Sequence, residues 1–194
     1  MYKKYIKRIL DVLFSIIFIV LFFLLYVIIA ICIKIESKGS ILFIQDRVGI
    51  NNKIFKIYKF RTMKIDAPKN SPTHLLKNSE SYITRVGAFL RKTSLDELPQ
   101  FINVIKADMS IIGPRPALFN QYDLIEGRKK FKVDTVRPGI TGLSQISGRD
   151  ELSIDKKIEY DYLYVKNLSF INDCKILFKT FFVVLSHKGI KEGA

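Results

Sequence analysis

The chain has 194 residues, with 32 lysines and arginines against 18 aspartates and glutamates, a net charge of +14. Two cysteines exclude a disulfide framework, and two histidines exclude a histidine-rich metal site. Such a basic chain suits an anionic partner, namely lipid headgroups, nucleotides or nucleic acid, although a membrane protein with its positive charge in the cytoplasm shows the same excess.

The first predicted element is an apolar run from Val12 to Ile33 that contains no charge, glycine or proline. A helix of this length measures about 33 Å, enough to match the core of a bilayer. The run is too long for a cleavable signal peptide, and no small-residue cleavage site follows it. We therefore predict a membrane-anchoring region at residues 1–39 and a cytoplasmic domain at residues 40–194.

The topology of this run stays open, because both of its flanks are basic. A spanning helix should show an asymmetry of lysine and arginine between its two sides, whereas a re-entrant helix keeps both flanks in the cytoplasm. Re-entry usually needs a break at proline, serine or threonine, and only Ser15 and Tyr26 interrupt the run. The basic residues on both flanks favour a re-entrant helix, and the lack of a helix-breaking residue opposes it. Re-entry is slightly favoured.

After the run, an α+β domain is predicted that is mainly helical. Ile41–Asp46 and Lys53–Phe60 have the pattern of a β-hairpin, and Asp66–Glu80 that of a loop. The apolar face of the last predicted helix suits either a membrane interface or core packing. The helices are expected at Tyr82–Arg91, Leu95–Ala107, Ser153–Val165 and Phe170–Leu185, and rigid loops at Ile112–Pro116 and Arg137–Arg149.

Two adjacent carboxylates, Asp96 and Glu97, carry the strongest chemical signal. A structural interpretation is a capping box from Ser94 to Glu97 at the start of a helix. In the functional interpretation the helix dipole keeps Asp96 ionised, so that it can attack phosphorus. A Mg²⁺ ion held by Asp96 and Glu97 would remove the repulsion between this carboxylate and an anionic diphosphate.

Basic residues for phosphate binding lie in three segments of the sequence. Lys59 stands in a YKFRTM segment, and Arg115 lies between two prolines that fix its backbone. Arg137 and Arg149 bracket a glycine-rich segment whose N–H groups suit a phosphate. Each of these features alone is typical of an ordinary surface charge or turn, and only their combination with the carboxylate pair and the apolar run indicates a phosphate site.

The segments QDRVG, YKFRTM, TSLDELPQFINVIKADMSIIGPRP and VRPGITGLSQISGR, in this order after an apolar helix, resemble the bacterial sugar transferases. More narrowly, the chain is similar to the small monotopic polyprenyl-phosphate phosphoglycosyl transferases from about Tyr2 to Gly189. The resemblance implies transfer of a sugar 1-phosphate from a nucleotide-diphosphate sugar, with uridine as the expected nucleoside, to polyprenyl (undecaprenyl) phosphate. This is the first membrane step of glycoconjugate, capsule or O-antigen assembly, at the cytoplasmic face of the bacterial inner membrane.

The resemblance also implies roles for individual residues. Asp96 would carry a covalent phosphosugar, and Glu97 would help to hold Mg²⁺. The positions at or around the family's site are here Lys59, Arg91, Arg115 and Asp161. One departure concerns the anchor: relatives carry a Ser-Pro pair inside the apolar helix, at a position that falls near Phe23-Leu24, where this chain has no proline.

Two other functions are alternatives to the transferase. A membrane-tethered basic module could bind nucleic acid or anionic lipid without catalysis, and a metal-dependent diphosphatase could use the same groups. The carboxylate pair opposes phosphate binding in the absence of a metal, and the interleaving of aromatic and basic residues typical of nucleic-acid folds is missing. We therefore expect a nucleotide sugar, a polyprenyl phosphate and membrane lipid as partners, and no nucleic acid. The sequence does not indicate which sugar is used or an oligomeric state.

Overall fold

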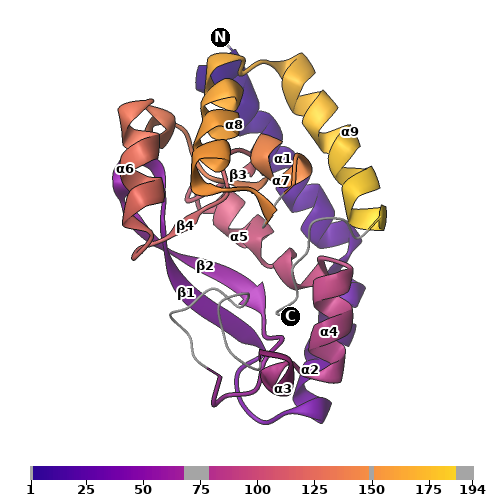
Figure 1. Ribbon diagram of the computed structural model, residues 1–194. Helices are drawn as coiled ribbons and strands as arrows, with labels where there is room; N and C mark the ends of the chain where they lie inside the picture. Colours follow the sequence, from indigo (N-terminus) through magenta and orange to yellow (C-terminus); the bar gives the residue numbers. More distant parts are fainter. Residues whose placement is uncertain (1, 68–78, 149–150, 187–194) are drawn as a thin grey trace.

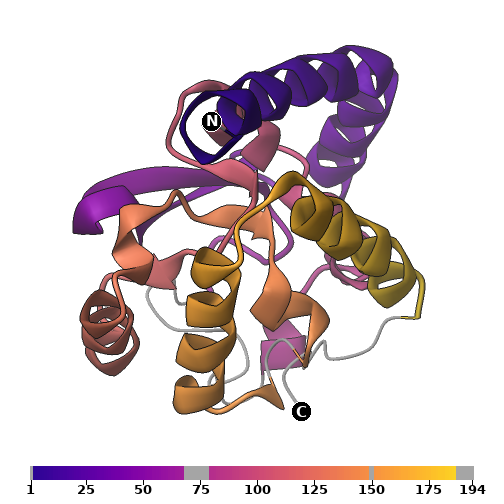
Figure 2. The ribbon, with the colours of Figure 1, turned by 90° about the horizontal axis from the view of Figure 1, so that it is seen from above.

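A computed structural model describes residues 2–67, 79–148 and 151–186. A bent pair of N-terminal helices lies along one side of a body in which small sheets are surrounded by short helices (Figures 1 and 2). The predicted α+β fold with a mainly helical body is confirmed. The proposed division into a membrane region and a cytoplasmic domain stays a prediction.

The apolar run forms two helices instead of one. After a π-helical turn at Tyr2–Ile6, α1 (Lys7–Leu21) and α2 (Phe23–Glu36) meet at a bend of 64°. Within the described residues no single helix is long and apolar enough to cross a membrane, whereas the two bent helices meet that criterion together. The break falls at Phe22 (φ −99°, ψ 13°), next to Phe23-Leu24, where the family resemblance implied a Ser-Pro pair.

The bend contains no proline, and contacts with the body hold it. On the α1 side, the ring of Phe18 stacks on that of Phe101, with centroids 4.3 Å apart. On the α2 side, the Tyr26 hydroxyl donates a hydrogen bond to the Leu98 carbonyl at 2.7 Å. Both arms of the bend therefore hold the same short segment of the body, so that tertiary contacts fix the angle between them.

The two outer ends of the helix pair are also held by the body. Near the start of α1, Arg8 donates hydrogen bonds of 2.7 and 3.1 Å to the last carbonyls of α5 (Gln100–Ile105). At the end of α2, the Glu36 carboxylate accepts hydrogen bonds of 2.7 and 2.9 Å from the first two N–H groups of α4 (Arg85–Lys92). Both outer ends of the helix pair therefore contact the same body of the protein.

The predicted hairpin is confirmed and has a third strand. β1 (Leu42–Val48) and β2 (Ile54–Phe60) pair antiparallel across a turn at Ile50–Asn52, in which both asparagines have positive φ. β4 (Ala117–Leu118) pairs with the far end of β1, so the sheet order is β2-β1-β4. This pairing brings the segment that contains Arg115 to the hairpin.

The segment 137–149, predicted as a rigid loop, contains regular structure. β5 (Gly139–Thr141) pairs parallel with β3 (Ser110–Ile112), and α7 (Leu143–Ile146) follows. The expectation of a loop is wrong here because a strand of three residues gives no pattern in the sequence, and its partner lies far away along the chain.

Most predicted helices are present, with shifted bounds. α8 (Ile154–Lys166) and α9 (Phe170–Ser186) confirm their predictions. The helix predicted at Tyr82–Arg91 is α4, which begins at Arg85 because Thr84 caps it by accepting a hydrogen bond from the Gly87 N–H at 2.9 Å. Tyr82 itself ends a separate short helix, α3 (Ser79–Tyr82). The described structure also contains α6 (Tyr122–Lys130) and a 3₁₀ turn at Val133–Thr135, which were not predicted. Most of the predicted loop 66–80 lies outside the described residues.

One core cluster joins the helix pair to the body. Ile29 and Ile33 of α2 are buried together with Phe60, Leu90 and Leu98. The outer faces of α1, α2 and α9, by contrast, expose large apolar side chains to a degree that is unusual for a protein surface in water. The most exposed are Ile9, Val20, Leu21, Phe23, Leu24, Ile35, Ile171, Phe178, Phe181 and Leu185.

Candidate active site

The carboxylate pair is buried in a 3₁₀ turn, Leu95–Glu97, that precedes α5. Asp96 is 9% exposed and Glu97 is 7% exposed. The preceding Ser94 has a left-handed backbone (φ 56°), and its buried Oγ forms no hydrogen bond within the described part of the chain. The predicted capping box is therefore wrong, because an N-cap residue needs an extended backbone to present its hydroxyl to the turn.

Two basic side chains meet on one oxygen of Glu97. The Lys59 Nζ, from β2, lies 2.8 Å from Glu97 Oε1 and 3.9 Å from Asp96 Oδ2. The Arg115 Nη1, from the GPRP segment, lies 3.2 Å from the same Glu97 oxygen. The structure thus brings together four of the predicted site residues from three separate segments.

Arg91 approaches the pair from α4. Its Nε donates a 2.9 Å hydrogen bond to the Thr62 hydroxyl, just after β2, and its charge lowers the pKa of Asp96. Because Thr62 belongs to the YKFRTM segment, that segment supplies both Lys59 and the residue that orients Arg91. The expected placement of Arg91 near the pair agrees with this geometry.

The protonation of Asp96 is set by opposing effects. Burial raises the pKa of Asp96; the charge of Lys59 lowers it, that of Glu97 raises it, and those of Arg91 and Arg115 lower it, with a net shift upward. Burial also lowers the pKa of the Lys59 ammonium, against the two carboxylates. The expected helix-dipole effect stays a prediction, because the pair lies in a turn directly before the N-terminus of α5. The neighbouring cations Lys59, Arg91 and Arg115 also favour the ionised carboxylate.

Asp161 occupies a different cluster from the carboxylate pair. Its Oδ2 accepts hydrogen bonds of 2.6 and 2.9 Å from Arg128, and its Oδ1 accepts one of 2.9 Å from Ser144. Arg128 in turn donates to the Arg115 carbonyl at 2.9 Å. Asp161 therefore supports the backbone of Arg115 through Arg128, and its predicted role at the substrate stays a prediction. The sequence analysis missed Arg128, because nothing in its local pattern marks it.

The glycine-rich segment does not reach the pair either. The Arg137 Nε donates to the Ala107 carbonyl at 2.8 Å, at the far end of α5. A Cβ on Gly139 or Gly142 would overlap the backbone of Gly113, so these glycines allow the chain to approach β3 closely. The structure thus gives Arg137 and the glycines structural contacts, and their predicted phosphate contacts stay predictions. Arg149 lies outside the described residues.

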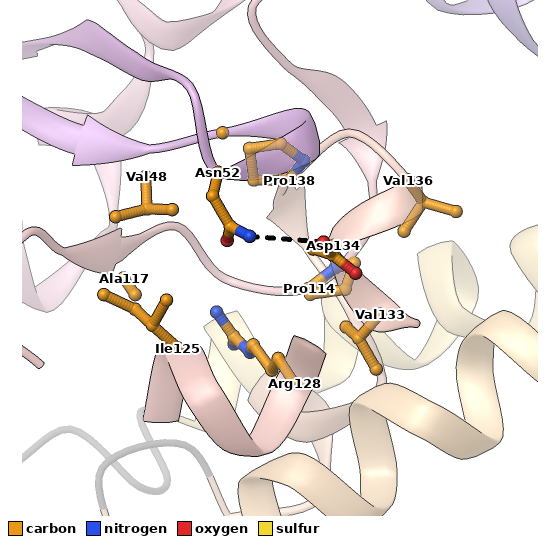
Figure 3. Close-up of a pocket in the computed structure, with 11 residues that line it drawn as sticks. Val48, Asn52, Pro114, Ala117, Ile125, Arg128, Val133, Asp134, Val136 and Pro138 are labelled. Atoms are coloured by element: carbon orange, nitrogen blue, oxygen red, sulfur yellow. Dashed lines mark hydrogen bonds between the residues drawn. The ribbon is translucent and has the colours of Figure 1, made fainter. Parts of the chain in front are cut away.

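A small pocket lies beside the GPRP segment (Figure 3). Pro114 and Ala117 line it, together with Asn52 and Asp134, which share a hydrogen bond of 3.2 Å. Neither carboxylate of the pair lines this pocket. We therefore do not assign it to the chemistry of Asp96.

The pair fits the way in which Mg²⁺ is bound at phosphate-transfer sites. Within the described residues, no group of three or more histidine, cysteine, aspartate or glutamate side chains converges as a metal cage. Mg²⁺ commonly takes only one or two protein carboxylates and completes its shell with water and substrate phosphate oxygens. Asp96 and Glu97 meet this requirement, and their role as metal ligands stays a prediction.

Comparison with known proteins gives the context of this site. The family described as "Bacterial sugar transferase" matches residues 2–187. An Aeromonas hydrophila UDP-N-acetylgalactosamine-undecaprenyl-phosphate N-acetylgalactosaminephosphotransferase is 41% identical over 96% of the chain and 45% of its own length. An Escherichia coli UDP-glucose:undecaprenyl-phosphate glucose-1-phosphate transferase is 41% identical over 92% of the chain and 40% of its own length.

The chain spans less than half of the length of these two relatives. A Bacillus subtilis protein named "Uncharacterized sugar transferase EpsL" has a similar size: it is 38% identical over 96% of the chain and 91% of its own length. The family match covers the apolar helix pair as well as the body that holds the carboxylate pair. The chain belongs to the bacterial sugar transferase family.

Proposed function

We propose that the chain transfers a sugar 1-phosphate from a UDP-sugar to undecaprenyl phosphate, releasing UMP. The observation that carries this proposal is the buried Asp96–Glu97 pair with Lys59, Arg91 and Arg115 around it. The names of the Aeromonas and E. coli relatives support the classes of donor and acceptor. The sugar itself is left open.

Asp96 is the proposed nucleophile. Its carboxylate oxygen attacks the phosphorus that carries the sugar, the bond from that phosphorus to the bridging oxygen breaks, and UMP leaves. The phosphosugar is then an acyl phosphate on Asp96. An oxygen of undecaprenyl phosphate attacks the same phosphorus, the bond to Asp96 breaks, and the sugar-diphosphate lipid leaves with the carboxylate restored.

The basic residues perform two tasks in this scheme. Lys59, Arg91 and Arg115 favour the ionised form of Asp96, which burial alone would suppress. They also offer N–H donors to the phosphoryl oxygens that carry charge in the transition state. Mg²⁺ held by Asp96 and Glu97 would neutralise part of the charge of the donor diphosphate.

A re-entrant placement of the helix pair agrees best with its contacts. A spanning helix carries its two ends on opposite sides of a membrane. Here Arg8, near one end, and Glu36, at the other, both bind the same body. We place that body at the cytoplasmic face of the bacterial inner membrane, with the bend at Phe22 directed into lipid.

The C-terminal helix is proposed to lie in the membrane interface. α9 exposes Phe178, Phe181, Phe182 and Leu185 by 53–68%. An apolar face of this kind on a helix that also carries lysines suits the headgroup region. Together with the helix pair, α9 would hold the site near the headgroup of a lipid acceptor that cannot leave the membrane.

The decisive experiment is mass spectrometry of the full chain in detergent after incubation with UDP-sugars and Mg²⁺. The expected result is a phosphosugar adduct on Asp96 and, after undecaprenyl phosphate is added, a sugar-diphosphate lipid. Asp96→Asn should give neither product while it keeps the wild-type unfolding temperature. Turnover by the Asn variant at the wild-type rate would refute the covalent mechanism, and release of sugar phosphate without lipid product would indicate a diphosphatase.

Topology has its own test. In a chain with Cys32 and Cys174 replaced by alanine, a Lys3→Cys variant places one thiol at the exposed N-terminal end. A maleimide that cannot cross membranes should label it in inverted vesicles and leave it unlabelled in intact spheroplasts. Labelling of spheroplasts would mean that the helix pair spans the bilayer.

A further inference from the structure

Gln100, the first residue of α5, is buried one helical turn after the carboxylate pair. Its side chain is 2% exposed, and within the described residues its Nε2 has no hydrogen-bond partner. Such an amide is unusual, because a buried donor without a partner has given up its bonds to water and gained nothing in return. An unpaired donor beside a reacting group is therefore suited to an acceptor that the substrate brings.

The spacing of Gln100 along the chain places it beside both carboxylates. The backbone is helical from the turn at Leu95–Glu97 through α5, since Leu98 and Pro99 between them also have helical φ and ψ. Gln100 follows Asp96 by four residues and Glu97 by three, and side chains with these spacings are neighbours on a helix. The Gln100 Nε2 nevertheless bonds to neither carboxylate.

Contacts with β2 identify the face of the helix on which Gln100 lies. Glu97, Gln100 and Asn103 follow one another at intervals of three residues, on a helical run that packs against β2 (Figure 1). At one end of this row Glu97 accepts a 2.8 Å hydrogen bond from Lys59, and at the other end Asn103 forms bonds of 2.7 and 2.9 Å with the backbone of the same strand. Gln100 lies between two residues that contact β2, on the side of the helix that Lys59 approaches.

Unpaired buried donors are concentrated around the carboxylate pair. Among the described residues, four buried side-chain atoms have no hydrogen-bond partner, and two of them belong to Ser94 and Gln100, on either side of the pair. Ser94 also has the left-handed backbone noted above. Unsatisfied groups and strained backbone of this kind gather at functional sites, where a ligand or a reaction intermediate compensates for them.

We propose that the Gln100 amide donates a hydrogen bond to the phosphoryl group that Asp96 carries during the reaction. This rests on the proposed function. The phosphoryl group bonded to Asp96 has anionic oxygens, which are strong acceptors. They extend beyond the carboxylate, toward side chains that the carboxylate itself does not reach. Gln100 is then a further catalytic residue, which adds a neutral donor to the cations Lys59, Arg91 and Arg115.

Beryllofluoride with Mg²⁺ is the probe, because this complex takes the place of a phosphoryl group on an aspartate and needs no turnover. Fluorine NMR titration of the full chain in detergent gives its Kd for the wild type, Gln100→Met and a control, Gln121→Met. Gln121 lies just before α6, where its Oε1 accepts a 2.9 Å hydrogen bond from the Leu118 N–H. We expect Gln100→Met to weaken beryllofluoride about tenfold or more, since the lost bond has a charged acceptor, and Gln121→Met to change the Kd less than twofold.

Unfolding temperatures separate contact with the phosphoryl group from a structural role. Because the Gln100 Nε2 is unpaired in the free protein, Gln100→Met should leave the unfolding temperature unchanged or raise it, whereas Gln121→Met removes a bonded acceptor and should lower it. A lower unfolding temperature for Gln100→Met with an unchanged Kd would mean that Gln100 only supports the packing of α5 on β2, which overturns the proposal. An absence of beryllofluoride binding by the wild type overturns it as well. If Gln100→Met does not fold, the Kd of Gln100→Leu decides.

The proposed function can fail independently of this contact. If the wild type forms the Asp96 adduct with a UDP-sugar but binds beryllofluoride equally well without Gln100, only the present inference fails. If no UDP-sugar gives an adduct while beryllofluoride binding depends on Gln100, the contact stands and the transferase proposal fails.

Discussion

Replacing Asp161 with asparagine tests whether this carboxylate supports the fold or contacts the substrate. Asp161 is 1% exposed and bonds to Arg128 and Ser144. The substitution keeps the shape of the side chain and removes its charge, which leaves Arg128 buried without its counter-charge. Breaking a buried ion pair in this way costs about 3–5 kcal/mol. For a chain of this size we expect the unfolding temperature to fall by about 6–20 °C.

Thermal unfolding of the full chain in detergent micelles measures this loss, and turnover is compared at a temperature where both proteins are folded. Because Arg128 also bonds to the Arg115 carbonyl, we expect a moderate loss of turnover as well. A double variant, Arg128→Met with Asp161→Leu, should unfold at a higher temperature than Asp161→Asn, because it leaves no unpaired buried charge.

The matched control is on the same helix. Glu159 of α8 forms an exposed ion pair with Lys156, with 2.7 Å between the charged atoms. Glu159→Gln should leave the unfolding temperature unchanged, because exposed ion pairs contribute little to stability. The reasoning is refuted if Asp161→Asn unfolds cooperatively within about 2 °C of the wild type but loses turnover. Asp161 would then act on the substrate, as the family resemblance implied.

Three further predictions follow from the site and its supports. Lys59→Met removes a charge that lowers the pKa of Asp96, so the acid side of the pH–rate profile should move to higher pH; an unchanged profile would contradict this. Gly87→Ala should cost about 2 kcal/mol in the free energy of unfolding, because a Cβ there overlaps the backbone of Thr62, and wild-type stability in a denaturant titration would disprove the clash. Tyr26→Phe should cost about 1 kcal/mol, and a variant as stable as the wild type would show that this hydroxyl bonds equally well to water.

Local patterns predicted the parts of the fold that depend on neighbouring residues. The hairpin over residues 42–60 is encoded by alternating strands around a turn, and α8 and α9 by helical periodicity. The bend at Phe22 depends on Phe101, far along the chain, so no reading of the apolar run alone could find it.

Of the candidate site, too, only a part could be predicted from the sequence. Charge and motif were sufficient to group Lys59, Arg115 and the carboxylate pair. The ion pair of Asp161 with Arg128 was not predicted, because it is fixed only by the packing of α6 on α8. The structural contacts of the glycines were not predicted either, because the parallel pairing of β3 with β5 defines them, and such a pairing is not visible in either segment alone.

The contacts of Leu98 tie the helix pair directly to the carboxylate pair. Leu98 follows Glu97, its side chain shares a core cluster with Ile29 and Ile33 of α2, and its carbonyl accepts the hydrogen bond from Tyr26. A close-packed core does not deform continuously, so the distance from the bend to Asp96 is fixed by packing rather than by a linker. If the proposed function holds, the acceptor headgroup stays at one depth in the bilayer, and the depth of Asp96 would then be set by how far α1 and α2 enter the lipid. The exposed apolar faces of these helices would therefore affect catalysis by setting the position of Asp96 relative to the bilayer, without contacting the substrate.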